Sequence, residues 1–210
     1  MGVGELIDLA AHRADRSRRS FGGRIAFFFD LACPFSYLTA ERVERTLGAV
    51  AWVPVAPLPG APSPGARALL AAEYQAMALR LPLVWPDTWP EPFPSAMRAA
   101  AYAASFGRSG QFALAASRLA FCGGFDLEDE EILADAAAAA GLAPGDLLAA
   151  TTDSSWDVEL EATAEGLGRR GVRELPALRL GTHWRSGQQA LAEAAALVRA
   201  GALDAALSGA

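Results

Sequence analysis

The spacing of apolar and polar residues predicts a strand, a helix and a second strand near the start of the chain. Residues 24–30 are apolar without alternation and rich in Phe, which indicates a strand buried on both faces. Residues 34–47 carry apolar side chains at helical spacing and are followed by Gly48, a common helix stop. Residues 50–55 predict the second strand, so the three elements form a βαβ unit.

A long block without strand texture follows a Pro- and Gly-rich boundary at residues 57–65. The helices expected within this block cover residues 66–81, 95–106, 111–121, 126–140 and 144–151. After it, Asp153 can cap a helix that runs to about residue 170. Residues 176–180 and 183–185 predict two strands joined by a Gly-containing turn, and residues 188–199 predict a final amphipathic helix.

This order of elements predicts an α/β, thioredoxin-like fold: a βαβ unit, then a β-hairpin and a helix, with a large all-helical insertion. The expected parts are a leader segment at residues 1–20, a thioredoxin-like domain formed by residues 21–64 and 152–210, and a helical insertion domain at residues 65–151.

The composition narrows the class of protein. The net charge of -6 argues against nucleic acid as a partner, since phosphate binding needs clustered positive charge. No apolar run is long enough for a membrane span, and no secretory signal is visible at the start of the chain. The two cysteines lie far apart and make no disulfide framework, so we expect a cytoplasmic protein.

Cys33 is the leading candidate for chemistry because it stands where the first strand ends and Pro34 begins a helix. The partial positive charge of a helix N-terminus favours thiolate over thiol, which predicts a reactive cysteine. The alternative is an inert, buried cysteine. Ser36 cannot form a disulfide, which excludes a two-cysteine cycle within this motif. Its hydroxyl can bond either the Cys33 thiolate or a backbone group of the first helical turn.

Two segments resemble the DsbA-like superfamily. Residues 28–38, with Cys33-Pro34-Phe35-Ser36 at their centre, are similar to its active-site region, and residues 171–178 are similar to its loop with a cis-proline. The most similar branch is that of the 2-hydroxychromene-2-carboxylate isomerases and kappa-class glutathione transferases, which often have Ser where this chain has Cys33.

The resemblance implies a thiol-binding site around Cys33. Pro34 and Phe35 are expected to line it. A cis bond before Pro176 would expose backbone groups of Leu175 to an extended substrate or to the cysteinyl part of glutathione.

Further along the chain, Ser186 matches a residue that grips the γ-glutamyl end of glutathione in the glutathione-using branch, while Gly187 replaces that branch's Asp. Arg185 is a candidate for binding an anionic thiol or acid; the alternative is a surface arginine at the end of a hairpin.

Several other residues have a structural and a functional interpretation. Cys122 is expected to lie in the core. Aromatic side chains at Trp85, Trp89, Phe93 and Tyr102 predict either a groove for an aromatic substrate or ordinary core packing. The two isolated histidines have no spacing that predicts a metal site.

Three functions remain open from the sequence. The first is a thiol-dependent oxidoreductase that exchanges disulfides through Cys33 alone, with a small thiol such as glutathione as co-substrate. The second is a thiol-dependent isomerase or transferase that acts on an aromatic acid. The third is a non-catalytic binding module. None needs a metal, and the sequence leaves a homodimer open.

Overall fold

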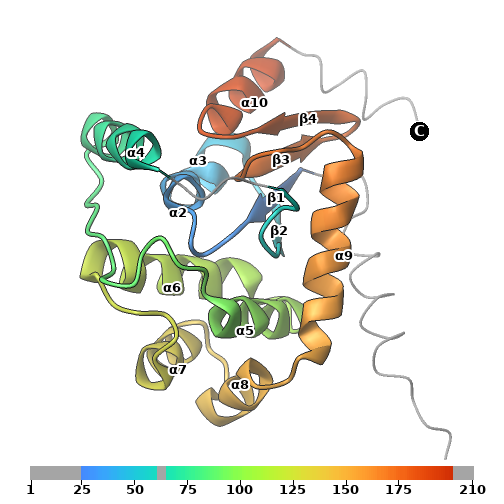
Figure 1. Cartoon of the computed structure of the whole chain (residues 1–210). Coiled ribbons are helices and arrows are strands. Elements are labelled where there is room, and N and C mark those ends of the chain that lie inside the picture. The colour runs from blue at the N-terminus through green and yellow to red at the C-terminus, as the bar shows by residue number, and fades with distance from the viewer. Residues whose placement is uncertain (1–24, 61–64, 201–210) are drawn as a thin grey trace, which may run out of the picture.

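A computed structural model describes residues 25–60 and 65–200 of the chain (Figure 1). The expected leader at residues 1–20 lies outside the described residues. A four-stranded mixed sheet forms the centre, in the order β2-β1-β3-β4. Strand β1 pairs in parallel with β2 and antiparallel with β3, and β3 forms the predicted hairpin with β4. The strands cover Ala26–Phe29 (β1), Ala51–Pro54 (β2), Ala177–Leu180 (β3) and His183–Ser186 (β4).

Strand β1 is buried on both faces, as its unbroken apolar sequence predicted. On one face, Phe27 and Phe29 join the larger core, against which Trp52 of β2 packs. On the other face, Phe28 and Val53 belong to a smaller core. Both faces of the sheet are therefore covered by helices.

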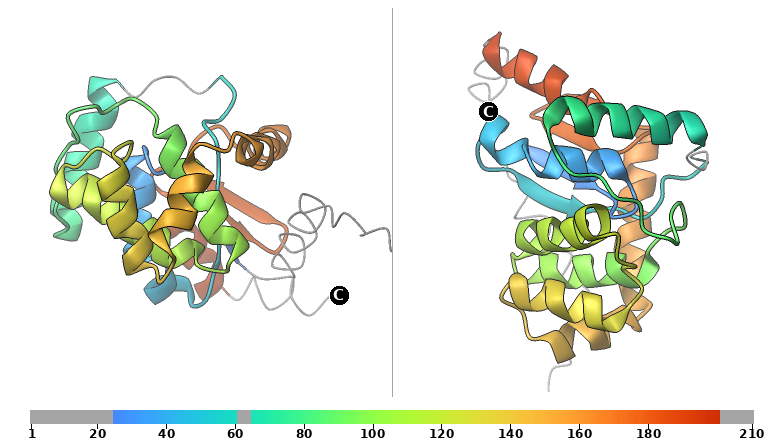
Figure 2. Two further views of the ribbon diagram at one scale, coloured as in Figure 1. Left: turned by 90° about the horizontal axis from the view of Figure 1, so that it is seen from below. Right: turned by 90° about the vertical axis from the view of Figure 1, so that its left-hand side faces the viewer.

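The block between residues 65 and 151 contains helices and no strand, and every residue in it is described. Its helices are α4 (Ala66–Leu79), α5 (Pro94–Ser105), α6 (Ser109–Gly123), α7 (Glu130–Ala139) and α8 (Pro144–Thr151). Figure 2 shows α5–α8 stacked against one side of the sheet. Helix α4 lies apart from them and beside α2 (Figure 1). The predicted fold class, with its helical insertion, is confirmed.

Helix α9 (Ser155–Arg169) links the helical block to the sheet. Trp156 and Leu160 near its start pack in the larger core, and Leu167 near its end packs in the smaller one. The N-cap residue of α9 is Ser154 and not the expected Asp153, although the Asp153 carboxylate accepts the backbone N–H of Ser155 at 2.9 Å. Helix α10 (Ala190–Arg199) completes the described chain. The division into parts at residues 65 and 152 stays a prediction.

The single helix expected over residues 34–47 is wrong. Two helices, α2 (Pro34–Ala40) and α3 (Val43–Leu47), replace it. Leu38 and Val43 are both fully buried. They stand five positions apart, which is about 140° around a continuous helix. The break between α2 and α3 lets both side chains reach the core, and the apolar spacing alone gave no sign of it.

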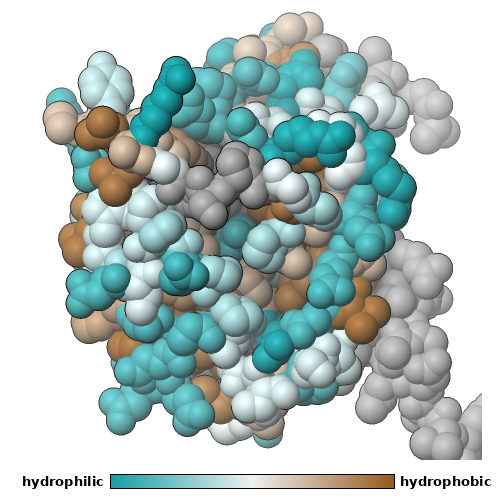
Figure 3. All heavy atoms as spheres, viewed as in Figure 1, coloured by the Kyte–Doolittle hydropathy of each residue, from teal (hydrophilic) through white to brown (hydrophobic). Residues whose placement is uncertain are grey.

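The exposed surface also carries apolar side chains. Leu70, Tyr74 and Met77 of α4 are largely exposed, and Figure 3 shows apolar groups gathered over this helix. Within residues 25–60 and 65–200, no helix combines the length and apolar character needed to cross a bilayer.

An ion pair joins α5 to α9 and makes a testable contribution to stability. Arg98 donates from Nε and Nη2 to the two carboxylate oxygens of Asp157, each at 2.8 Å, and from Nη1 to the Thr151 carbonyl at 3.0 Å. The side chains of the pair are 23% and 33% exposed, so water screens them only in part. Three charge-assisted bonds in one place predict a measurable stabilisation.

We expect Arg98→Ala to lower the free energy of unfolding by about 1–3 kcal/mol, measured by urea denaturation. Arg169→Ala is the matched control, because its pair with Glu165 is 69% and 64% exposed. That control should change stability by less than about 0.5 kcal/mol. Equal effects of the two substitutions would contradict the prediction.

Candidate functional site

Cys33 lies where the sequence placed it, between the end of β1 and the start of α2. It is the N-cap residue of α2, with Pro34 at the first helical position. Its carbonyl accepts the backbone N–H groups of Ser36 and Tyr37 at 3.0 and 3.2 Å, which starts the helix. The side chain of Cys33 is part-exposed, while Pro34 is buried.

The loop before β3 meets Cys33 across the fold. The Leu175–Pro176 peptide bond is cis. The Cys33 thiol donates to the Leu175 carbonyl oxygen, with 3.5 Å between the two atoms. The Pro176 carbonyl in turn accepts the N–H of Gly187 at 2.9 Å, which ties the loop to the end of the hairpin. The structure thus brings together the two segments that carried the sequence resemblance.

The expected thiolate is wrong for this conformation. Burial, and secondly the Asp30 carboxylate, raise the pKa of Cys33 to about 11. Hydrogen bonds from the Ser36 hydroxyl and from the backbone at Ser36 and Phe35 act in the opposite direction but are outweighed. The hydrogen bond from Cys33 to the Leu175 carbonyl also indicates a protonated thiol, because only a protonated sulfur can donate it. The helix N-terminus is present, but its effect is smaller than that of burial.

Asp30 is the site residue that sequence reasoning missed. Burial raises its pKa to about 6, although the Ala32 N–H donates to Oδ1 at 2.9 Å and lowers it. The available signal was an acidic residue at the end of an apolar run, three positions before Cys33. At neutral pH this carboxyl is ionised while the thiol keeps its proton, so the site pairs a weak base with a weak acid.

Ser36 bonds Cys33, which is one of the two roles that the sequence left open. Its backbone partner is Asp30, which precedes α2, and not a group of the first helical turn. The Ser36 hydroxyl oxygen accepts the backbone N–H of Asp30 at 3.3 Å, and its side chain is buried. It also hydrogen-bonds Cys33 and lowers the pKa of that thiol. Ser36 therefore holds the carboxyl-bearing turn and the thiol in one arrangement.

Two of the four candidate aromatic residues lie beside this turn. Trp89 donates its indole N–H to the Ala32 carbonyl at 3.1 Å, and its ring lies 4.3 Å from that of Trp85. By contrast, Phe93 is buried in the core, and Tyr102 packs its ring against Trp156. The sequence did not distinguish the two tryptophans beside the turn from the two aromatic residues in the core, because the same apolar spacing occurs in a groove and in a core.

The two hairpin residues that were candidates for ligand binding, Arg185 and Ser186, have partners within the fold. Arg185 pairs with Glu193 of α10, with 3.4 Å between Nε and Oε2, so its guanidinium has a partner in the fold. Ser186 is part-buried and pairs with Ala177 across the hairpin. Binding of a ligand by Arg185 or Ser186 stays a prediction.

Gly187 adopts a φ of +79° and packs closely against the Glu174 carboxylate, which occupies the space that a side chain at position 187 would need. The Glu174 carboxylate beside Gly187 comes from the loop that contains the cis bond. Sequence position alone gave no sign of this contact, because strands β3 and β4 separate Glu174 from Gly187 along the chain.

Cys122 belongs to a separate cluster. Its sulfur lies 3.2 Å from the hydroxyl of Tyr37, which donates to the Pro82 carbonyl at 2.9 Å. Burial, together with Cys122, raises the pKa of Tyr37. Cys33 and Cys122 are both free thiols, and Cys122 packs against the larger core as expected.

Comparison with known proteins agrees with the sequence resemblance. The model of the DSBA-like thioredoxin domain family matches residues 24–198. A solved 2-hydroxychromene-2-carboxylate isomerase superposes with a TM-score of 0.70 at 17% identity, over 87% of this chain and 98% of that protein. A probable DsbA oxidoreductase from Streptomyces coelicolor gives a TM-score of 0.68 at 22% identity, over 89% and 91%. No curated protein sequence matches the chain. At these identities the two structures establish a shared fold.

Proposed function

Because the chain belongs to the DSBA-like thioredoxin domain family, we propose that it is a thiol-dependent oxidoreductase that exchanges disulfides through Cys33 alone. The observation that supports this most is the contact between the Cys33 sulfur and the Leu175 carbonyl, beside the cis bond to Pro176. A substrate that displaces this contact meets the sulfur and a free backbone acceptor at the same time.

The proposed reaction begins when a disulfide R–S–S–R′ replaces the hydrogen bond from Cys33 to Leu175. The thiol proton passes to the Asp30 carboxylate, whose pKa of about 6 leaves it ionised at neutral pH. The Cys33 sulfur then forms a bond to one substrate sulfur, and the S–S bond breaks. The leaving thiolate R′–S⁻ takes the proton, which leaves a Cys33–S–S–R mixed disulfide.

An external thiol completes the cycle, because Ser36 offers no second sulfur. A low-molecular-weight thiol such as glutathione attacks the mixed disulfide and releases R from the protein as a new disulfide with that thiol. Cys33 recovers its proton and its reduced form. The free state of both cysteines fits a reducing compartment, so a cytoplasmic location is part of the proposal.

A second candidate function rests on the protonation of Cys33. A thiol whose pKa is about 11 acts as a hydrogen-bond donor at neutral pH. It can donate to the sulfur of a bound thiol cofactor, as a serine would, in an isomerase or transferase that acts on an aromatic acid. The Glu174 carboxylate beside Gly187 then offers a partner for the ammonium group of such a cofactor. A module that binds a thiol without turnover is the remaining alternative.

Incubation with oxidised glutathione tests the first proposal. We expect mass spectrometry to show one glutathione adduct, at Cys33, with no internal disulfide. The exchange should be slow near pH 7 and faster as pH rises, because the pKa of Cys33 lies at about 11 in the free protein. Cys122→Ser is the matched control and should retain the adduct. An adduct at Cys122 alone would contradict the proposal.

A further inference from the structure

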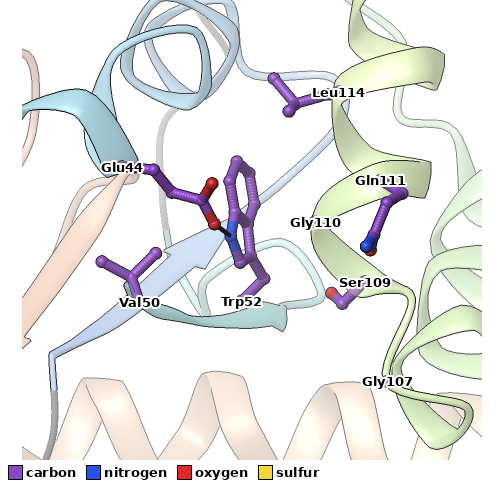
Figure 4. Close-up of a pocket in the computed structure, with 8 residues that line it drawn as sticks. All are labelled: Glu44, Val50, Trp52, Gly107, Ser109, Gly110, Gln111 and Leu114. Carbon is purple, nitrogen blue, oxygen red and sulfur yellow. Dashed lines mark hydrogen bonds between the residues drawn. The ribbon is translucent and has the colours of Figure 1, made fainter. Parts of the chain in front are cut away.

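We infer that a second small-molecule site lies at the N-terminus of α6, and that it accepts an aromatic α-amino acid or a similar aromatic zwitterion. A hollow of about 320 Å³ opens there between α6, α3 and β2 (Figure 4). This volume is at the lower end of the range for small-molecule pockets. Its main polar groups come from Glu44, Trp52, Ser109 and Gln111.

This hollow is separate from the Cys33 site. Trp52 pairs with Phe27 in the first half of β1, whereas Cys33 follows the far end of the same strand. None of the residues that line the hollow touches the Cys33 turn through a hydrogen bond in the described part of the chain. The inference is therefore independent of the function proposed above.

The first turn of α6 supplies a positive pole. Helix α6 has 15 residues, and among the described residues no side chain caps its start. The backbone N–H of Phe112 is the first to bond within the turn, to the Arg108 carbonyl at 3.0 Å. The N–H groups of Ser109, Gly110 and Gln111 precede the first intrahelical bond. Such N–H groups, together with the helix dipole, attract an anionic group.

Ser109 gives an independent sign of a missing ligand. The residue is only 7% exposed, and its Oγ is buried with no hydrogen-bond partner among the described residues. It lines the hollow, and Figure 4 shows its oxygen turned from α6 toward the side where Trp52 lies. A buried hydroxyl without a partner is unfavourable, and a ligand carboxylate at this helix start would accept a hydrogen bond from it.

Glu44 supplies a negative pole next to the same indole. Its Oε1 accepts the indole N–H of Trp52 at 2.9 Å, while its Oε2 has no bond to any described residue. Gly110 brings the start of α6 against the indole, because a Cβ at this position would lie 2.8 Å from Nε1. The nitrogen edge of the Trp52 indole therefore lies between Glu44 and the start of α6.

This arrangement selects for a particular ligand chemistry. A simple anion is repelled by Glu44, and a simple cation gains nothing from the N–H groups of α6. A zwitterion places its carboxylate at Ser109 and its ammonium at Glu44. The indole of Trp52 is held edge-on by Phe27, with 5.0 Å between ring centroids and 80° between planes, so it offers a rigid surface for an aromatic ring.

Calorimetric titration of the full chain with L-phenylalanine tests the inference. We expect binding to weaken by about tenfold or more for phenylacetate, which lacks the ammonium, and for phenethylamine, which lacks the carboxylate. Glu44→Gln should lower the affinity for phenylalanine by about five- to tenfold. The affinity for phenylacetate should stay the same or rise. Ser109→Ala should weaken the binding of phenylalanine and of phenylacetate, which both carry a carboxylate. It should leave the binding of phenethylamine unchanged.

Two controls separate this site from others. Cys33→Ser and Glu130→Gln, the latter an exposed carboxylate on α7, should leave phenylalanine binding unchanged. Absence of binding by the parent protein would overturn the inference. Equal affinity for phenylalanine and phenylacetate, or unchanged binding in both Glu44→Gln and Ser109→Ala, would also overturn it.

Discussion

Replacing Cys33 with serine should reduce disulfide exchange by about a thousandfold or more, to the background rate. A hydroxyl ionises far less readily than a thiol and cannot form a mixed disulfide, so no other group in the motif can replace the lost sulfur. The measurement is turnover of a small disulfide such as oxidised glutathione, with a second thiol present in excess. Cys122→Ser is the control and should keep most of the parent activity, because Cys122 bonds Tyr37 and lies outside the Cys33 site.

The same substitution separates the two enzyme hypotheses. If Cys33 only donates a hydrogen bond to the sulfur of a thiol cofactor, serine can donate the same bond. Thiol-dependent isomerisation or conjugation of an aromatic acid would then survive in Cys33→Ser, and the oxidoreductase proposal would be wrong. If the parent protein is inactive in both assays over a panel of thiols, the binding module becomes the better explanation.

The sequence predicted the parts of the site that depend on local pattern. Cys33 comes shortly after the end of β1 and directly before the helix-initiating Pro34, so its placement needs no information about distant residues. The meeting of Cys33 with Leu175 came from the resemblance, because 142 positions separate the two residues and no periodicity links them.

The protonation of Cys33 could not be predicted from the same local pattern. A helix N-terminus favours the thiolate, but burial opposes it, and burial depends on how the helical block, the loop at Leu175 and β1 pack together. The Asp30 carboxylate adds to the same effect, since two negative charges in one buried site are unfavourable. The sign of the shift was therefore decided by tertiary structure.

The break between α2 and α3 is a second example. Glu41 lies at the end of α2 and accepts two hydrogen bonds from Arg118 of α6, at 2.6 and 2.8 Å. That partner lies 77 positions away, so the helical spacing of residues 34–47 contained no trace of it. The contact between Gly187 and Glu174 shows the same limit, because it joins two segments that no sequence periodicity links.

Asp30→Asn should stabilise the protein at neutral pH and lower the pKa of Cys33. The folded protein holds the Asp30 pKa at about 6, against 3.8 for the unperturbed group, so folding favours the protonated form. Stability from this group is complete below about pH 4 and declines as pH rises through about 6. The loss amounts to about 3 kcal/mol at pH 7. Asparagine is always neutral and keeps an oxygen for the Ala32 N–H, so the variant should not show this decline.

Urea denaturation of both proteins at pH 4 and pH 7.5 measures this difference. We expect the two free energies of unfolding to be close at pH 4, and the variant to exceed the parent by about 2–3 kcal/mol at pH 7.5. The rate of Cys33 alkylation should rise several-fold at pH 8, because the variant lacks the carboxylate charge that opposes thiolate formation. Catalytic disulfide exchange should nevertheless fall, since the variant has no carboxylate to accept the thiol proton. An unchanged alkylation rate would show that Asp30 does not act on Cys33, and faster exchange would remove it as the proton acceptor.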